Sequence, residues 1–295
     1  MAKDKTTAGA SLFRSRRDFT KEPPADVGLP VAAAVMAAPP AAMLPTPNGV
    51  PMHIFAGPGY SGKSFVAKYI IDMAIADGKT LGVAEMDPAK RELVRRYGPE
   101  AVMQPTDGEV PTTDPAQVVS WLVRYLDWLL AQKPVPPTLL EFGGGDTALI
   151  RLVTDMPDLL GTLQASGVAP VLWHFLTPRV EDLGTLATLE KLGFKPPAMV
   201  LVTNDALLRQ TDHAEAFGRV QAHPVYRRAL DAGAVPLRVP ALSPELAAEV
   251  DHGMGFTAYN AHLVSQGFGG LMMRAMDGWV TRMRGALAPV EAYLP

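Results

Sequence analysis

The sequence predicts an α/β fold with three layers, in which a mainly parallel central sheet is covered by helices on both faces. From residue 50 onward, short apolar segments alternate with longer segments of helical periodicity, which is typical of parallel strands joined by helices. The short segments are apolar throughout and bounded by Gly, Pro or Asp, as strands buried on both faces are. The expected strands are residues 52–56, 81–85, 138–142, 168–176, 199–203 and 235–239.

The 295-residue chain is expected to hold one folded domain, residues 48–295, after a flexible Ala/Pro-rich tail, residues 1–47. The apolar stretch 29–44 is interrupted by Pro39 and Pro40, and it is shorter than the roughly 20 apolar residues that span a bilayer. Arginines precede this stretch, so a degraded export signal is the alternative interpretation. We expect no membrane span and a cytoplasmic location.

Helices are expected between and after the strands. Asp114 and Pro115 form a typical helix start, and Gly78 and Gly98 form typical helix ends. The last segment is rich in Met and Arg and is expected to form a C-terminal helix laid on the domain. The expected helices are residues 64–77, 89–97, 115–131, 180–192, 243–250 and 271–287.

Composition excludes several kinds of chemistry. The chain has no cysteine, so disulfides, cysteine-bound metals and thiol nucleophiles are excluded. The formal net charge is −3, which gives no global attraction to nucleic acid, although a local basic patch would not show in that sum.

The most informative stretch is the glycine-rich loop after the first expected strand. Gly57-Pro58-Gly59-Tyr60-Ser61-Gly62-Lys63-Ser64 matches the phosphate-loop (P-loop) motif G-x-x-x-x-G-K-S/T, and a helix is expected directly after it. In this context, backbone N–H groups of the loop and the helix N-terminus bind phosphate. The sequence therefore predicts a P-loop nucleotide-binding fold.

Two side chains of the loop have expected roles in phosphate chemistry. Lys63 would place its charge toward the β- and γ-phosphates, and Ser64 would supply a hydroxyl ligand for Mg²⁺. We count Phe65, the next residue, with the nucleotide-binding residues.

Acidic residues follow two further expected strands. Glu85 and Asp87 end the second strand, and Glu141 ends the third, before Gly143-Gly144-Gly145 and Asp146. Ligands of open α/β sheets bind at the carboxyl edge of the strands, so these acids are expected at the phosphate site. The glycines would let backbone N–H groups move toward a γ-phosphate, and Asp146 could instead cap the next helix.

The order of these motifs resembles that of the ParA/MinD-like ATPases over about residues 50–250. The family's D-x-D-P segment is similar to Glu85-Met86-Asp87-Pro88, and its D-x-x-G segment to Glu141-Phe142-Gly143-Gly144. The resemblance implies that Asp87 orients the attacking water, that Glu85 and Glu141 belong to the Mg²⁺ site, and that the Gly144 amide senses the γ-phosphate. It also implies that Asn204 contacts the adenine.

Three positions depart from the family pattern. Pro58 stands where the family has a lysine that reaches the partner's phosphate in a dimer, so that contact is absent, while dimerisation itself stays open. Glu85 and Glu141 stand where the family has aspartates. The extra methylene either preserves Mg²⁺ coordination through a displaced water or slows hydrolysis, and slow turnover is expected.

These observations predict a switch ATPase that uses ATP and Mg²⁺, with Lys63 and Asp87 as catalytic residues. The expected process is plasmid or chromosome partition, or mobile-element transfer or maintenance, by family analogy. A protein partner is expected, and a homodimer and DNA stay open as partners. The alternatives are a P-loop phosphotransferase with Asp87 as base toward a substrate hydroxyl, and a scaffold that binds nucleotide without hydrolysis.

Overall fold

The computed structural model describes residues 43–87, 90–107, 110–210 and 217–295. The chain divides into two units, Met1–Pro39 and Pro40–Pro295, and the first lies outside the described residues, as does most of the predicted tail. The end of that predicted tail, residues 43–47, belongs to the second unit, where Leu44 is buried and its N–H donates to the Pro289 carbonyl at 3.0 Å.

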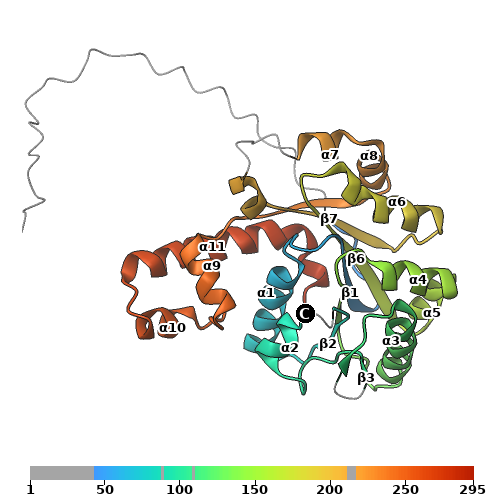
Figure 1. The fold of residues 1–295 in the computed structure, drawn as a ribbon, viewed down its shortest axis with the longest axis horizontal. Helices are drawn as coiled ribbons and strands as arrows, with labels where there is room; N and C mark the ends of the chain where they lie inside the picture. Colours follow the sequence, from blue (N-terminus) through green and yellow to red (C-terminus); the bar gives the residue numbers. More distant parts are fainter. Residues whose placement is uncertain (1–42, 88–89, 108–109, 211–216) are drawn as a thin grey trace, which may run out of the picture. The chain divides into compact units, whose positions relative to one another are not determined.

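A six-stranded sheet with the order β2-β5-β1-β6-β7-β8 forms the centre of the second unit. Every neighbouring pair in this sheet is parallel, so the carboxyl ends of all the strands lie at one edge (Figure 1). The predicted fold class is thereby confirmed. The strands are β1 (Val50–Ala56), β2 (Gly82–Glu85), β5 (Thr138–Glu141), β6 (Val168–Leu176), β7 (Ala198–Asn204) and β8 (Val235–Val239).

Helices cover both faces of the sheet, and each face has its own hydrophobic core (Figure 1). One core is formed with α1 (Lys63–Ala76), α2 (Glu92–Tyr97), α9 (Pro244–Asp251), α10 (Tyr259–Ser265) and α11 (Gly270–Leu287). The other is formed with α3 (Pro115–Leu130), α4 (Thr147–Asp155), α5 (Leu159–Ala165), α6 (Leu183–Lys191), α7 (Gly218–Ala222) and α8 (Pro224–Asp231).

Side-chain alternation along the strands explains how two cores arise from wholly apolar segments. On β1, Ile54 packs in the core of α3 and α4, whereas the next residue, Phe55, packs in the core of α1 and α11. Successive side chains of a strand point to opposite faces, so a strand covered on both sides must be apolar at every position.

The expected strands agree with the observed ones to within two residues at each end. The expected helix starts at Asp114 and at residue 243 are also confirmed, since Asp114 and Ser243 accept hydrogen bonds from the first turns of α3 and α9. The predicted helix 180–192 begins instead as a 3₁₀ turn, Val180–Asp182, before α6. A short hairpin of β3 (Thr106–Asp107) and β4 (Val110–Pro111) was not predicted.

Among the described helices, none combines the length and the apolar character needed to cross a membrane.

Candidate functional site

The glycine-rich loop joins β1 to α1 at the carboxyl edge of the sheet, as predicted. Gly62 adopts φ +100°, in the left-handed region, and a Cβ there would lie 2.4 Å from the Asn204 Nδ2 atom. Only glycine avoids both the backbone strain and this clash. The loop therefore passes directly beside the end of β7, which fixes the place of the α1 N-terminus.

Lys63 is the first residue of α1, and its side chain folds back over the loop. Its ammonium donates to the Gly57 and Pro58 carbonyls at 2.7 and 2.8 Å, and the residue is only 6% exposed. Burial lowers the pKa of this ammonium, while the carboxylates of Asp146 and Glu141 act in the opposite direction. The arrangement holds one positive charge inside the loop.

Ser64 and Glu141 meet directly across the site. The Ser64 hydroxyl donates to Glu141 Oε1 at 2.6 Å, although 77 positions separate the two residues. The parallel register places Glu141 beside Phe55 of β1 and beside Glu85 of β2. The sequence prediction that Ser64 and Glu141 belong to one group is therefore consistent with their contact.

The Glu141 carboxyl is buried, and this controls its charge. Burial raises its pKa to about 8, with the hydrogen bond from Ser64 opposing the shift and the neighbouring Glu85 adding to it. Its second oxygen, Oε2, is buried without a hydrogen-bond partner among the described residues. A buried oxygen of this kind is costly unless a cation or donor satisfies it.

Asp87 and Gly144 flank the same site. Asp87 Oδ1 accepts from the Lys90 N–H at 3.4 Å, and a Cβ on Gly143 would lie 3.2 Å from the Asp87 Cβ. A Cβ on Gly144 would lie 2.9 Å from the Gly59 nitrogen. Gly144 thus lies directly against the phosphate loop, where only a residue without a side chain fits.

A cavity of about 170 Å³ joins most of the predicted site residues. Of these residues, its walls contain Tyr60, Gly62, Lys63, Ser64, Phe65, Glu85, Asp87, Glu141 and Gly144. Most of the residues predicted to bind phosphate and Mg²⁺ therefore lie around one space.

Glu85 has backbone partners that the sequence analysis did not foresee. Its two oxygens accept hydrogen bonds from the N–H groups of Leu93 and Val94, at 3.2 and 3.1 Å. These amides belong to the first turn of α2, where N–H groups have no partner inside the helix. Glu85 therefore anchors the N-terminus of α2, and binding a metal ion would compete with these bonds.

Asn204 lies at the end of β7, and its side-chain amide faces the phosphate loop. Its Nδ2 donates to the Ser61 carbonyl at 3.4 Å, and its Oδ1 accepts from the Ala206 N–H at 2.9 Å. The contact of Asn204 with adenine stays a prediction. In the structure, the Asn204 side chain holds the phosphate loop through its hydrogen bond to Ser61.

Asp146 belongs to the site, although the sequence assigned it no role in binding phosphate or metal. It was considered as a cap of the following helix, but its side chain makes no capping bond to α4. Instead its Oδ2 accepts from the Gly57 N–H at 2.8 Å, and the residue is 2% exposed. Burial raises its pKa to about 6, and Gly57 and Lys63 oppose that shift. The only signal in the sequence was a carboxylate directly after the glycine run.

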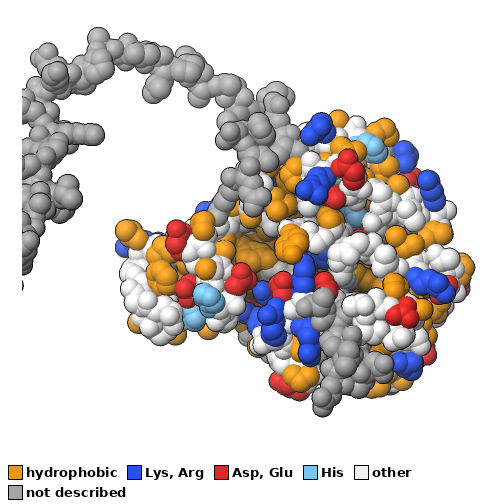
Figure 2. Space-filling view, in the orientation of Figure 1, with side chains coloured by type: hydrophobic (Ala, Val, Ile, Leu, Met, Phe, Trp, Pro, Cys, Tyr) orange, Lys and Arg blue, Asp and Glu red, His pale blue; other side chains and the backbone are white. Residues whose placement is uncertain are grey.

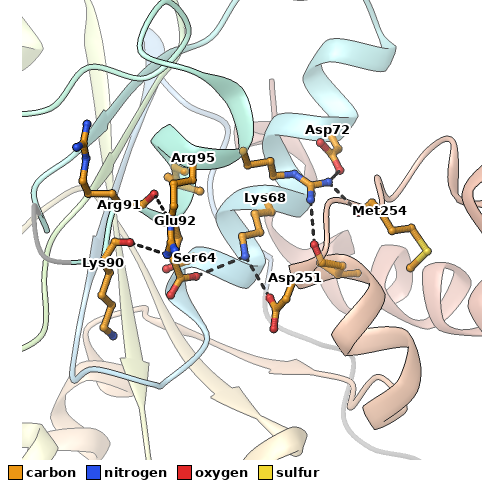
Figure 3. Close-up of polar contacts among 12 residues, drawn as sticks. Ser64, Lys68, Asp72, Lys90, Arg91, Glu92, Arg95, Asp251 and Met254 are labelled. Atoms are coloured by element: carbon orange, nitrogen blue, oxygen red, sulfur yellow. Dashed lines mark hydrogen bonds and ion pairs between the residues drawn. The ribbon is translucent and has the colours of Figure 1, made fainter.

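A charged cluster lies beside the site, between α1, α2 and α9. The Lys68 ammonium bridges Glu92 and Asp251, each at 3.4 Å. Figure 3 shows Lys68 between these two acids and Asp72 further along the same helix. The cluster borders a second cavity of about 810 Å³, and Figure 2 shows basic and acidic side chains around the hollow in this region.

Asp72 and Arg96 each form three hydrogen bonds in this cluster. Its Oδ2 accepts from Arg96 Nη2 and from the Phe256 N–H, both at 2.9 Å, and its Oδ1 accepts from the Tyr97 hydroxyl at 2.7 Å. Arg96 also donates to the Val250 and Met254 carbonyls. These bonds join α1 to α2 and to the chain after α9.

No protein-family profile matches the chain, and no curated protein matches it. Among solved structures, FtsY from Mycoplasma mycoides aligns with a TM-score of 0.35 and 14% identity over 66% of this chain and 61% of that one. FlhF, in a complex with GTP and Mg²⁺, aligns with a TM-score of 0.38 and 10% identity over 68% of this chain and 69% of that one. The chain thus spans less than two thirds of that FtsY.

Proposed function

We propose that this protein is a Mg²⁺-dependent ATPase that works as a molecular switch, of the ParA/MinD-like kind. The observation that carries the proposal is the Ser64–Glu141 hydrogen bond of 2.6 Å beside the buried Lys63 ammonium. The hydroxyl belongs to the first turn of α1, and the carboxylate ends the neighbouring strand β5. P-loop nucleotide hydrolases hold their metal ion with a hydroxyl and a carboxylate in this arrangement beside the phosphates.

The residues present fit Mg²⁺. This ion prefers hard oxygen ligands, and the site offers the Ser64 hydroxyl and the Glu141 carboxyl, whose Oε2 has no partner among the described residues. We assign Ser64 and Glu141 as the residues that hold it, with Glu85 beside them as the anchor of α2. When bound, the ion supplies positive charge that neutralises the phosphate oxygens.

The chain's own residues account for the remaining steps. Lys63 stabilises the negative charge on the phosphoryl oxygens, and the N–H groups of the loop bind the same phosphates. Asp87 orients the water that attacks the terminal phosphorus in line with the leaving group. A P-loop that releases its product slowly is suited to a switch, because the bound state then lasts long enough to recruit a partner.

The contacts around Gly144 support a switch. The segment from Gly143 to Asp146 touches the phosphate loop twice, through the close approach of Gly144 to Gly59 and through the Asp146–Gly57 hydrogen bond. A change of phosphate occupancy would move this segment. We propose that the moved segment presents a surface to a protein partner or DNA, in partition or mobile-element transfer.

Replacing Asp87 with Ala tests the catalytic part of this proposal. We expect phosphate release from ATP to fall by about 100-fold or more, because a residue that positions the nucleophile contributes at least that factor. We expect ATP affinity to change little, since Lys63 and the loop are intact. Phosphate release is measured with ATP and with GTP, with Mg²⁺, with and without DNA, and affinity by calorimetry.

The same measurement separates the alternatives. If ATP turnover requires a small-molecule acceptor, the protein is a phosphotransferase and not a switch ATPase. Tight ATP binding by the wild type without turnover under any condition would leave the nucleotide-binding scaffold, and the Asp87→Ala change would then have no effect.

A pH dependence follows from the buried Glu141 carboxyl. With a pKa raised to about 8 by burial, this group is largely protonated at pH 6.5 and must lose the proton to bind a cation. We expect the increase in melting temperature caused by MgCl₂ to be larger at pH 9 than at pH 6.5. The Glu141→Gln variant, which keeps the shape of the side chain, should show little increase at either pH. If MgCl₂ raises the melting temperature of the wild type and of Glu141→Gln equally, Glu141 is not a ligand of the Mg²⁺ ion.

A further inference from the structure

A second lysine, Lys90, lies on the phosphate loop. Its ammonium is 4.2 Å from the centre of the Tyr60 ring, and Tyr60 belongs to the loop and is 87% exposed. This is the geometry of a cation–π contact. Figure 3 shows the Lys90 side chain pointing away from the Lys68 ion pairs. The Lys90 ammonium is therefore held against the loop, and it is separate from the charged cluster between α1, α2 and α9.

The Lys90 ammonium lies where the loop meets the glycine run. A Cβ on Gly59 would be 3.6 Å from Lys90 Nζ, and a Cβ on Gly144 would be 2.9 Å from the Gly59 nitrogen. Three segments thus meet at Gly59: the phosphate loop, the glycine run after β5 and the chain after Asp87. Asp87 and Gly144 flank the terminal phosphate in the function proposed above, so Lys90 stands at that end of the site.

The charge of Lys90 reaches the cavity. Lys90 lines the same 170 Å³ space as Lys63 and Ser64. Two cations that raise each other's energy are stabilised together when an anion lies between them.

The phosphate loop offers few positively charged or N–H groups to a terminal phosphate. A bound nucleoside triphosphate carries more negative charge than a diphosphate, and its terminal phosphate holds the largest share of that charge. Pro58 has no N–H to donate, and the Lys63 ammonium lies against the loop's own carbonyls. Among the described residues, Lys90 forms no ion pair within 4.0 Å, so its charge is not already neutralised by a neighbouring carboxylate.

We propose that Lys90 is a second phosphate-binding cation, that it contacts the terminal phosphate of a nucleoside triphosphate, and that Tyr60 positions it. The proposal rests on the nucleotide-binding function and adds a specificity to it: Lys90 makes the site prefer a triphosphate to a diphosphate. Because Lys90 and the loop belong to one chain, this preference needs no second copy of the protein.

The test compares the affinities of ADP and of a non-hydrolysable ATP analogue, measured by calorimetry with and without Mg²⁺. We expect Lys90→Met to weaken binding of the analogue by about tenfold, the usual size of one charge-assisted hydrogen bond, and binding of ADP by less than about twofold. Lys90→Arg, which keeps the charge, should restore most of the preference. The matched control is Lys79→Met, which removes a half-exposed lysine at the far end of α1.

A second pair of variants tests the positioning role of the ring. Tyr60→Phe keeps the aromatic face and should retain the preference, whereas Tyr60→Ala should reduce it by about threefold. Equal losses for ADP and the analogue in Lys90→Met, or no loss for either, would overturn the assignment of Lys90 while leaving nucleotide binding intact. Wild-type protein that binds neither ligand would instead overturn the proposed function, and the role of Lys90 with it.

Discussion

The Lys63→Ala variant is expected to bind ATP and ADP at least about 100-fold more weakly than the wild type. Lys63 is the only cationic side chain inside the phosphate loop, and it is almost fully buried there. A buried charge acts through a low local dielectric, and each charge-assisted hydrogen bond to a phosphate contributes about 1.5–3 kcal/mol. Loss of one or two such bonds corresponds to the expected decrease in affinity.

Calorimetric titration with both nucleotides checks this result. The control is Lys79→Ala, because Lys79 is exposed and forms only a 3.6 Å ion pair with Asp77. The melting temperature must also be compared, since Lys63 bonds the Gly57 and Pro58 carbonyls in the structure. A folded Lys63→Ala protein with unchanged affinity for both nucleotides would mean that the loop is not a phosphate site.

The strands and the phosphate loop could be predicted because their signals are local. Each strand is a short apolar run with a turn residue at its end, and the loop is a contiguous motif between a strand and a helix. The helices α3 and α9 were equally predictable, since Asp114 and Ser243 cap them through hydrogen bonds and a proline follows each cap.

Of the five described helices that were not predicted, four lack such signals. The fifth, α8, has them, because the His223 side chain accepts from the Val225 N–H and Pro224 follows that cap. No side-chain hydrogen bond caps the N-terminus of α4, α5, α7 or α10, and these helices have nine residues or fewer. Short uncapped helices have little intrinsic stability and form because the body of the domain packs against them. A single sequence shows little of that packing.

Two features of the site depended on contacts between distant parts of the chain. Asp146 bonds Gly57 across 89 positions, and no spacing rule relates the two residues. Lys90 reaches Tyr60 because α2 docks on α1, and Glu85 holds the first turn of α2. Sequence patterns could place acids at the correct edge of the sheet, but the choice of partner for each acid is made by the tertiary fold.

Stability should depend most strongly on the Asp72 network. We expect Asp72→Ala to lower the free energy of unfolding by about 3–5 kcal/mol, because it leaves the Arg96 guanidinium buried without its carboxylate. Both side chains of this pair are about nine-tenths buried, with exposed fractions of 9% and 10%. The Tyr97 hydroxyl and the Phe256 N–H would lose their acceptor as well. Urea unfolding monitored by circular dichroism measures the change.

The matched control for this prediction is Asp77→Ala. Asp77 is the residue directly after α1, and its ion pair with Lys79 is half exposed. We expect a loss of no more than about 1 kcal/mol there. Replacing both partners, Asp72→Leu with Arg96→Met, should recover part of the stability, because an apolar pair of similar volume leaves no buried charge. A loss in Asp72→Ala no larger than in the control would show that water solvates Arg96 through the neighbouring cavity.

The Asp72 and Lys63 variants should also differ in which property they lose. Asp72 lies two helical turns beyond Ser64, and its partners hold α2 and the chain after α9 in place, away from the phosphates. Asp72→Ala protein that is still folded at low temperature should therefore bind ATP with near wild-type affinity. If it instead loses triphosphate binding while keeping ADP binding, the docking of α2 is what brings Lys90 to the terminal phosphate, and the charged cluster then serves nucleotide selection as well as stability.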